Sequence, residues 1–188
     1  SEVIETMDTI NRQVDDIKNL VDEFSNFARM PAPNMQKYNI KNIIDNAISL
    51  FELESSNVVI DLDKRSLDYS VKCDESQINR VFNNLIINSI HSIESRYKNK
   101  PGGSIYIDGS INDKYIKIKI LDNGQGLTHK EEDLLKPYFS TKEKNIGTGL
   151  GLSIVEKIIS EHGGNFHIYN LEDKPGACSE FTLRLFND

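Results

Sequence analysis

The sequence predicts an α/β fold in which one long bundle helix precedes a two-layer sandwich, a mixed, mostly antiparallel sheet with three helices on one face. Three observations predict this fold. Apolar residues recur every three or four positions at the start of the chain, strand and helix patterns alternate in the remainder, and a Pro-rich segment separates the two parts. The 188 residues suffice for one ordinary domain with an appendage.

The N-terminal segment has the pattern of a helix that packs in a bundle. Its apolar residues follow a repeat of about 3.5 residues. They are Val3, Met7, Ile10, Val14, Ile17, Val21, Phe24 and Ala28. Ile4, Leu20 and Phe27 widen the stripe beyond a two-helix seam, as in a four-helix bundle. The length of the unbroken repeat and the Pro-Ala-Pro break after it favour such a bundle over an amphipathic helix packed on its own domain. Because Pro residues stop the helix, we expect a helical segment over 1–32, a linker over 33–36 and a domain over 37–188.

The domain that follows alternates between strands and helices. The expected strands are 37–40, 58–62, 69–72, 104–110, 115–121, 165–170 and 179–186, and the expected helices are 42–53, 74–97 and 150–161. Asp74 and Gln77 resemble a capping box at the start of the middle helix, and Gly163 marks the end of the last helix. Residues 122–147 are rich in Gly and in charge, so we expect a loop that acts as a mobile lid.

Composition restricts the classes of function. The formal net charge of -7 disfavours binding to nucleic acid, which draws on basic patches. The sequence contains no apolar run of the roughly 18 residues that a membrane span requires, and its start lacks the features of a signal peptide, so we expect a cytoplasmic segment without membrane contact. Cys73 and Cys178 lack metal-ligand spacing, and we expect both to be small buried thiols.

Polar side chains share one face of the middle helix. Arg80, Asn84, Asn88 and His91 follow one another at intervals of three or four residues. An amide offers a carbonyl oxygen to a hard cation and N–H donors to phosphate, and Mg²⁺ needs few protein ligands when phosphates complete its shell. Helix geometry alone leaves a solvated polar face as the alternative to a magnesium and phosphate site.

Two Gly-rich segments add further candidate contacts. Asp122 ends the strand 115–121, where its carboxylate can accept from an exocyclic amine, and Gly124 and Gly126 let the backbone approach a flat ligand. A turn is the alternative interpretation of Asp-Asn-Gly. Residues 147–152 open the last helix, where exposed backbone N–H groups and the helix N-terminus favour phosphate without basic residues.

Together the three segments resemble a known family. Residues 84–89, 122–126 and 147–152 resemble the N, G1 and G2 boxes of the histidine-kinase ATPase superfamily, which includes gyrase, the Hsp90 chaperones and MutL. Residues 137–142 resemble the F box of sensor kinases, and residues 20–31 resemble nitrogen-regulation sensors of the NtrY type. The resemblance over 37–188 implies the Bergerat-type fold, with ATP and Mg²⁺ as cofactors.

The resemblance assigns roles to individual residues. It implies that Asn88 coordinates Mg²⁺ with support from Asn84, that Asp122 recognises the adenine amino group, and that Gly124 and Gly126 lie beside the base. The implied nucleotide contacts nearer the phosphates are His91, Lys142, Gly147, Thr148, Gly149, Leu150 and Gly151. Among these, Lys142 would contact the γ-phosphate, whereas His91 either contacts phosphate or caps the polar face.

The resemblance also gives the N-terminal segment a meaning. Residues 1–32 resemble the second helix of a dimerisation and phosphotransfer hairpin, which implies a homodimeric parent protein anchored in the membrane. The phosphoacceptor His of such a hairpin precedes an acidic residue, and none of His91, His129, His162 and His167 does. We therefore expect a protein-histidine kinase whose ATP phosphorylates a His outside this sequence, for relay to an Asp of a response regulator. The alternatives are a stand-alone kinase or switch of the anti-sigma-factor type and an interaction module without nucleotide.

Overall fold

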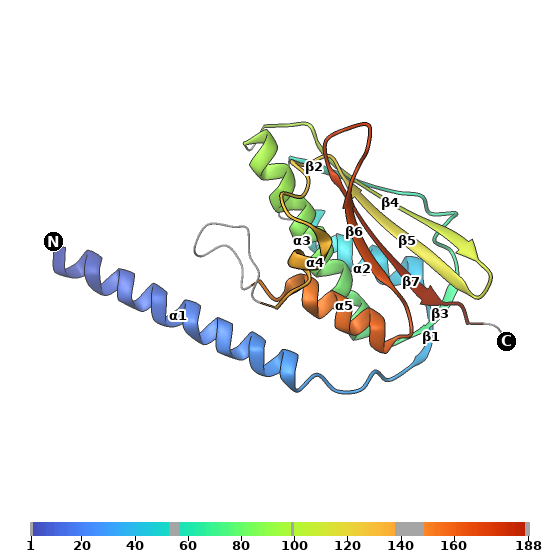
Figure 1. Cartoon of the computed structure of the whole chain (residues 1–188), viewed down its shortest axis with the longest axis horizontal. Helices are drawn as coiled ribbons and strands as arrows, with labels where there is room; N and C mark the ends of the chain where they lie inside the picture. Colours follow the sequence, from blue (N-terminus) through green and yellow to red (C-terminus); the bar gives the residue numbers. More distant parts are fainter. Residues whose placement is uncertain (1, 53–56, 99, 138–148, 187–188) are drawn as a thin grey trace.

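The computed structural model describes residues 2–52, 57–98, 100–137 and 149–186. Figure 1 shows the long helix α1 (Glu2–Ala28) projecting from an α/β domain. The other elements, in chain order, are β1 (Gln36–Asn39), α2 (Ile40–Glu52), β2 (Val58–Leu62), β3 (Ser70–Cys73), α3 (Glu75–Tyr97), β4 (Gly103–Asn112), β5 (Tyr115–Asp122), α4 (Glu131–Leu134), α5 (Gly151–Glu161), β6 (Phe166–Asn170) and β7 (Ala177–Arg184). The predicted fold class is confirmed.

The main sheet has five strands in the order β2-β4-β5-β7-β6. Only β2 and β4 pair in parallel, and the other pairs are antiparallel. Strands β1 and β3 form a separate two-stranded antiparallel sheet, which the sequence did not predict as a second sheet. In β5, Ile116, Ile118 and Ile120 are buried while Lys117 and Lys119 are half-buried on the opposite face, so strict alternation separates a helix-covered face from an outer one.

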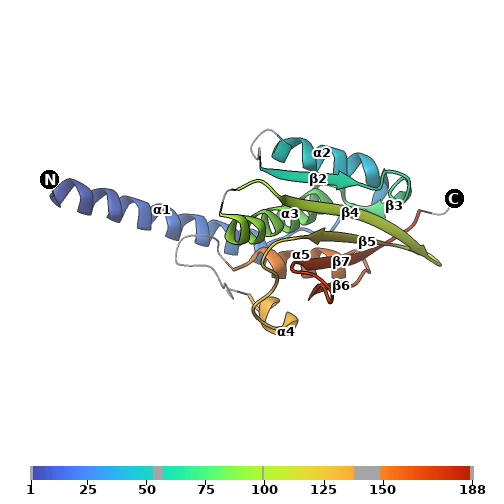
Figure 2. The same cartoon turned by 90° about the horizontal axis from the view of Figure 1, so that it is seen from above.

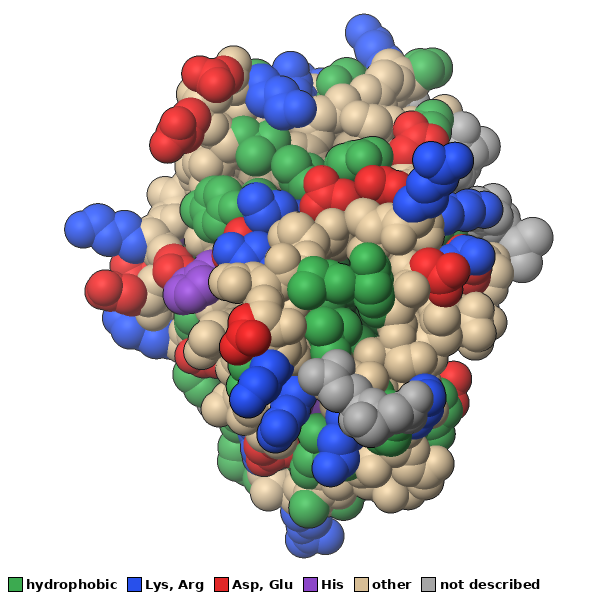
Figure 3. Space-filling view, turned by 90° about the vertical axis from the view of Figure 1, so that its right-hand side faces the viewer, with side chains coloured by type: hydrophobic (Ala, Val, Ile, Leu, Met, Phe, Trp, Pro, Cys, Tyr) green, Lys and Arg blue, Asp and Glu red, His purple; other side chains and the backbone are tan. Residues whose placement is uncertain are grey.

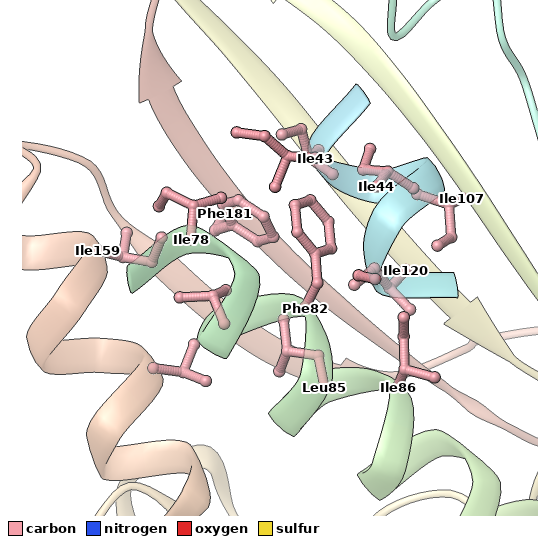
Figure 4. Packing of buried hydrophobic residues seen from close by; sticks show 14 of the residues in the cluster. Ile43, Ile44, Ile78, Phe82, Leu85, Ile86, Ile107, Ile120, Ile159 and Phe181 are labelled. Atoms are coloured by element: carbon pink, nitrogen blue, oxygen red, sulfur yellow. The ribbon is translucent and has the colours of Figure 1, made fainter. Parts of the chain in front are cut away.

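The core lies between the sheet and the three helices α2, α3 and α5, as Figure 4 shows for its central part. Helix α3 contributes Ile78, Phe82, Leu85 and Ile86 to this core, and all four are essentially inaccessible to solvent. The ring of Phe82 meets the ring of Phe181 from β7 edge to face, with 5.5 Å between centroids. This packing fixes the orientation of α3, whose polar face therefore points away from the sheet.

Asp74 caps the N-terminus of α3, but the predicted capping box is only half correct. The Asp74 carboxylate accepts a hydrogen bond from the backbone N–H of Gln77 at 3.1 Å. The Gln77 side chain does not return the bond: its Oε1 accepts nothing from Asp74, and its amide N–H donates to the carbonyl oxygen of Pro31 at 3.0 Å. The Asp74 N–H instead donates to Nε2 of His162 at 3.0 Å. Tertiary contacts with the linker and with α5 thus replace the local reciprocal bond.

The described part of the predicted lid is not entirely loop. Residues 131–134 form the short helix α4, and Oε1 of Glu131 accepts a hydrogen bond from the backbone N–H of Ile168 in β6 at 2.9 Å. The expectation of an unbroken loop over 122–147 is therefore wrong for this segment, which the carboxylate anchors to the edge strand. Residues 138–147 lie outside the described residues, so the predicted lid motion remains a prediction.

Helix α1 extends away from the domain, as Figures 1 and 2 show. Most of its described apolar side chains are exposed. Among the described residues, no helix is long and apolar enough to cross a membrane. At the opposite end of the molecule, Lys and Arg side chains lie among Asp and Glu side chains (Figure 3). The thiols of Cys73 and Cys178 are both buried and unpaired with each other, as predicted.

Candidate functional site

The last residue of β5, Asp122, is a carboxylate that is only 6% exposed. Its Oδ1 accepts a hydrogen bond from the Gly124 N–H at 2.8 Å, and the hydroxyls of Ser89 and Ser92 in α3 donate to its two oxygens at 3.3 and 3.5 Å. Burial raises the pKa of Asp122, while hydrogen bonds from Gly124, Ala177 and both serines oppose the rise. The two serine contacts are long and therefore weak, so a ligand donor can compete with them for the carboxylate oxygens.

The segment after Asp122 is pinned against α3 and is not a hairpin turn. A Cβ at Gly124 would collide with the side chain of Ser92, so only glycine brings the backbone this close to the helix. The Asn123 side chain donates hydrogen bonds to the hydroxyl of Tyr97 at 3.1 Å and to the carbonyl of Gly102 at 2.9 Å. The turn interpretation fails because β5 pairs with β4 and β7, neither of which directly follows it in the chain.

Gly126 follows at φ +81°, a left-handed conformation that favours glycine. The next residue, Leu127, is held on both backbone groups by the side chain of Asn170 at the end of β6. Its N–H donates to Oδ1 of Asn170 at 2.6 Å, and its carbonyl accepts from Nδ2 at 3.0 Å. The backbone beside Asp122 is therefore fixed by residues of α3 and β6 and by Gly102 before β4.

The polar face of α3 lies against the start of α5. The Asn84 side chain donates to the Arg80 carbonyl at 2.8 Å. This bond holds the amide so that its Oδ1 lies 3.0 Å from the position that a Cβ on Gly151 would occupy, while the Nδ2 of Asn88 lies 4.0 Å from it. The structure thus places Asn84, Asn88 and Gly151 close together, and their role in binding a nucleotide stays a prediction. His91 is half-buried on the same helix, and both interpretations of its role remain open.

Among the described residues, the N-terminus of α5 receives no side-chain cap from the residue before it. Leu150 is fully buried, its side chain accepts no hydrogen bond from the first N–H groups, and the first turn contains no acidic residue. The Leu150 carbonyl accepts from the backbone of Ile154 and from the hydroxyl of Ser153, both at 2.9 Å. The helix therefore directs its first N–H groups and positive dipole end toward the amides of Asn84 and Asn88, where an anion is favoured.

Helix α3 sets the spacing between the two halves of this site. Ser92 and Ser89 contact the Asp122 carboxylate, whereas Asn84 contacts the start of α5. Eight residues separate Asn84 from Ser92, which corresponds to about 12 Å along the helix axis. An elongated ligand can therefore donate a hydrogen bond to Asp122 at one end and place phosphate groups against the N–H groups of α5 at the other.

The amides also fit a divalent cation. The described residues contain no group of three or more His, Cys, Asp or Glu side chains that could hold a metal. A hard cation between α3 and α5 would therefore take its protein oxygens from Asn84 and Asn88 and the remainder of its shell from ligand phosphates and water. Such a shared shell suits Mg²⁺, which loses its waters reluctantly.

Three predicted contacts cannot be located. Lys142, Gly147 and Thr148 lie outside the described residues. Conversely, sequence reasoning gave no role to Ser89, Ser92 or Asn170, all of which fix the region around Asp122. The signal for the two serines was their three-residue spacing on the helix that carries Asn84 and Asn88, but serine at such a spacing has many other uses.

The sequence is similar to that of known ATPases and sensor kinases. The sequence profile of the family described as histidine kinase-, DNA gyrase B- and HSP90-like ATPase matches residues 73–187. The nitrogen regulation protein NtrY of Azorhizobium caulinodans is 36% identical over 94% of this chain and 23% of its own length. A putative NtrY-like sensor histidine kinase of Rickettsia typhi is 35% identical over 94% of this chain and 28% of its own length. The chain thus spans about a quarter of the length of these relatives.

Solved structures give the same assignment. The catalytic domain of histidine kinase ThkA superposes with a TM-score of 0.67 at 28% identity, over 81% of this chain and 96% of that domain. Full-length ShkA, solved in complex with AMPPNP, superposes over 100% of this chain and 40% of its own with a TM-score of 0.78, but its 19% identity supports the fold alone. The chain belongs to the family of histidine kinase-, DNA gyrase B- and HSP90-like ATPases, whose domain binds ATP.

Proposed function

We propose that this chain is the ATP-binding catalytic portion of a two-component sensor histidine kinase. The observation that carries the proposal is the approach of Gly151 to the amides of Asn84 and Asn88, with Asp122 held at the other end of α3. The start of α5, which has no side-chain cap from Leu150, thus lies beside two amides that can bind a metal ion. The buried carboxylate lies further along α3. Within the ATPase family, the similarity to NtrY and to an NtrY-like sensor histidine kinase favours a sensor kinase.

Three groups of residues in the chain would bind the adenine base, the phosphates and the magnesium ion of Mg-ATP. Asp122 accepts a hydrogen bond from the 6-amino group of adenine, while Gly124 and Gly126 keep the backbone close to the base. The N–H groups of Gly151 and of the residues beside it bind the phosphates. Asn88, supported by Asn84, holds Mg²⁺, which supplies charge neutralisation for the transferring phosphate when it is bound.

The reaction is a phosphoryl transfer to an imidazole. A ring nitrogen of a His on a partner helix forms a bond to the γ-phosphorus, the bond from that phosphorus to the β,γ-bridging oxygen breaks, and ADP leaves. The phosphoryl group then passes to an Asp carboxylate of a response regulator. The chain's residues contribute position and electrostatic stabilisation and no covalent intermediate.

The N-terminal helix would supply the parent protein's dimer interface. Six large apolar side chains of α1 are between 48% and 61% exposed, namely Met7, Ile10, Val14, Ile17, Val21 and Phe24. A stripe of this length needs apolar partners, which a four-helix bundle of two parent chains provides. We assign residues 1–32 to that bundle, 33–36 to the linker and 37–188 to the catalytic domain, all on the cytoplasmic side of a membrane-anchored parent.

A stand-alone switch of the anti-sigma-factor type has less support. Such a protein has no use for an exposed helical stripe of this length, and the relatives reported above are sensor kinases. A module without nucleotide is also disfavoured, because Asn84, Asn88, Asp122 and Gly151 are all in place around one helix.

The function is tested by incubating the chain with ATP labelled on its γ-phosphate, alone and with a separate domain that carries the parent's phosphoacceptor helix. We expect acid-labile label on the added domain and none on this chain, because no His of this sequence precedes the acidic residue that assists transfer. Replacing the acceptor His of the added domain should abolish labelling.

Two results would contradict the proposal. One is robust label on this chain alone that disappears when His91, His129, His162 or His167 is replaced. The other is acid-stable label on a Ser of the added domain, which would favour a serine kinase of the same superfamily.

A further inference from the structure

The end of α1 is bound to the catalytic domain instead of leading into a free linker. Phe27 and Met30 are half-buried and pack against the domain's hydrophobic core. Phe27 belongs to the stripe predicted for the bundle, yet here it faces the domain, while Phe24 one turn earlier is 48% exposed. The transition from bundle helix to domain contact therefore falls within the last turn of α1.

One side chain from α5 holds that last turn. The ammonium of Lys157 donates a hydrogen bond to the carbonyl oxygen of Phe27 at 3.0 Å and lies 5.0 Å from the centre of the Phe27 ring. The last four carbonyls of a helix have no partner within the helix, and a cation there is favoured by the helix dipole. The last turn of α1 contains no basic residue, and Lys157 places a cation at this helix end from 130 residues away.

The linker beyond is fixed to α3 at two further points. The Gln77 amide donates to the carbonyl of Pro31 at 3.0 Å, and the N–H of Asn34 donates to the Asp74 carboxylate at 2.9 Å. Asp74 is at the same time the N-cap of α3. These contacts tie residues 31–34 to the catalytic domain. A change in the angle between α1 and the domain would therefore have to occur before Pro31, at a pivot over residues 28–30.

We propose that Lys157 is a positioning residue that latches the last turn of α1 to α5 and so sets where the nucleotide site stands relative to the bundle. The bond crosses the pivot at 28–30, whereas the Gln77 and Asp74 contacts lie beyond it. Lys157 also stands six residues after Gly151 on one short helix, about 9 Å along its axis. A displacement of α1 against α5 is thereby transmitted to the start of the phosphate-binding helix.

The latch is tested in this chain with Lys157→Met, which removes the charge and keeps the aliphatic stem. We expect hydrogen exchange at residues 29–36 to accelerate roughly threefold to thirtyfold, as loss of one capping cation and one cation–π contact implies. Exchange in β5 should stay unchanged. Lys157→Arg should retain slow exchange because a guanidinium can still donate to the carbonyl and stack on Phe27. Lys64→Met, a change at an exposed lysine on a distant loop, is the control.

The positioning role rests on the proposed function and is tested by transfer to the separate acceptor domain described above. We expect Lys157→Met to change kcat at least threefold while KM for ATP stays within twofold, and Lys157→Arg to restore the rate. Unchanged kcat, or a change confined to KM, would overturn the positioning role. Exchange at 29–36 equal to that of the unmodified chain would overturn the latch itself. Failure of the unmodified chain to bind Mg-ADP would instead refute the proposed function and leave the exchange result standing.

Discussion

At the scale of single residues, Asp122 combines burial with two long hydrogen bonds. The carboxylate is removed from water, and the two serine hydroxyls that reach it from α3 lie at 3.3 and 3.5 Å, longer than the 2.8 Å bond from Gly124. Burial raises the pKa of Asp122. A ligand N–H that completes its bonding is therefore favoured over a ligand acceptor, which would face an unpaired buried oxygen.

Asp122→Asn should erode the preference for ATP over GTP. Adenine offers an amino donor to the carboxylate, whereas guanine presents a carbonyl at the corresponding position. Because an unpaired buried polar group costs about 1–3 kcal/mol, we expect the ratio of the two dissociation constants to fall by roughly fivefold to a hundredfold. Competition binding with both nucleotides measures the ratio.

Asp108→Asn is a matched control for that variant. Asp108 is a partly buried carboxylate of β4 whose pKa is also raised by burial, but it pairs with Lys119 in the strand register, on the outer face of the sheet. Its replacement should leave the ratio unchanged. Equal affinity of the unmodified chain for ATP and GTP would show that Asp122 does not select the base.

Sequence reasoning identified the residues whose chemistry is distinctive. Asp122, Asn84 and Asn88 stood out because the three segments together resemble one family, whereas each segment alone also fits a solvated helix face or a turn. Ser89 and Ser92 could not be assigned, since their role depends on how close α3 lies to β5, which is set by core packing and not by local pattern. The predicted γ-phosphate contact, Lys142, lies outside the described residues.

At the scale of elements, hydrophobic periodicity predicted the helices and strands that pack on the core. The limits of β2 were predicted without error, and α3 begins at the predicted cap and ends at the predicted residue. Two features were missed because their bonds are tertiary. The β1–β3 sheet pairs segments some thirty residues apart, and α4 is anchored through Glu131 to β6. Neither pairing leaves a signal in local sequence.

Gly151→Ala separates the stability of α5 from its role in binding. Alanine is the better helix former by up to about 1 kcal/mol, so thermal stability should be equal or higher. The added Cβ would lie 3.0 Å from Oδ1 of Asn84, which must then shift. We expect Mg-ADP affinity to fall roughly tenfold, as loss of one hydrogen bond to a charged group implies.

Calorimetric titration and thermal unfolding measure the two quantities on the same sample. Ser160→Ala, at an exposed position of the same helix, should leave the affinity unchanged. Unaltered Mg-ADP affinity in Gly151→Ala would mean that the contact between α5 and Asn84 plays no part in nucleotide binding.

At the scale of the whole molecule, the exposed stripe on α1 predicts self-association. Ile17 is 61% exposed near the middle of the helix. Burial of one such side chain contributes about 1.5–3 kcal/mol, so Ile17→Asp, which also places a charge in the interface, should weaken a dimer by at least roughly tenfold. Sedimentation velocity over a concentration series measures the association, and Asn19→Asp, on the side of the helical repeat opposite the stripe, is the control. A monomer at all concentrations in the unmodified chain would contradict a dimer held by α1 alone.

The measurement that most directly tests the nucleotide site is calorimetric titration of the chain and of Asn88→Ala with Mg-ADP and with adenosine in the absence of magnesium. We predict Mg-ADP binding at micromolar to millimolar strength. Asn88→Ala should weaken it by roughly tenfold to a hundredfold, because hydrogen bonds and ligation to charged groups are lost, while adenosine binding stays within about twofold. Asn79→Ala, outside the polar face of α3, should bind both ligands normally. No heat at millimolar Mg-ADP, or equal losses for both ligands in Asn88→Ala, would contradict the site between α3 and α5.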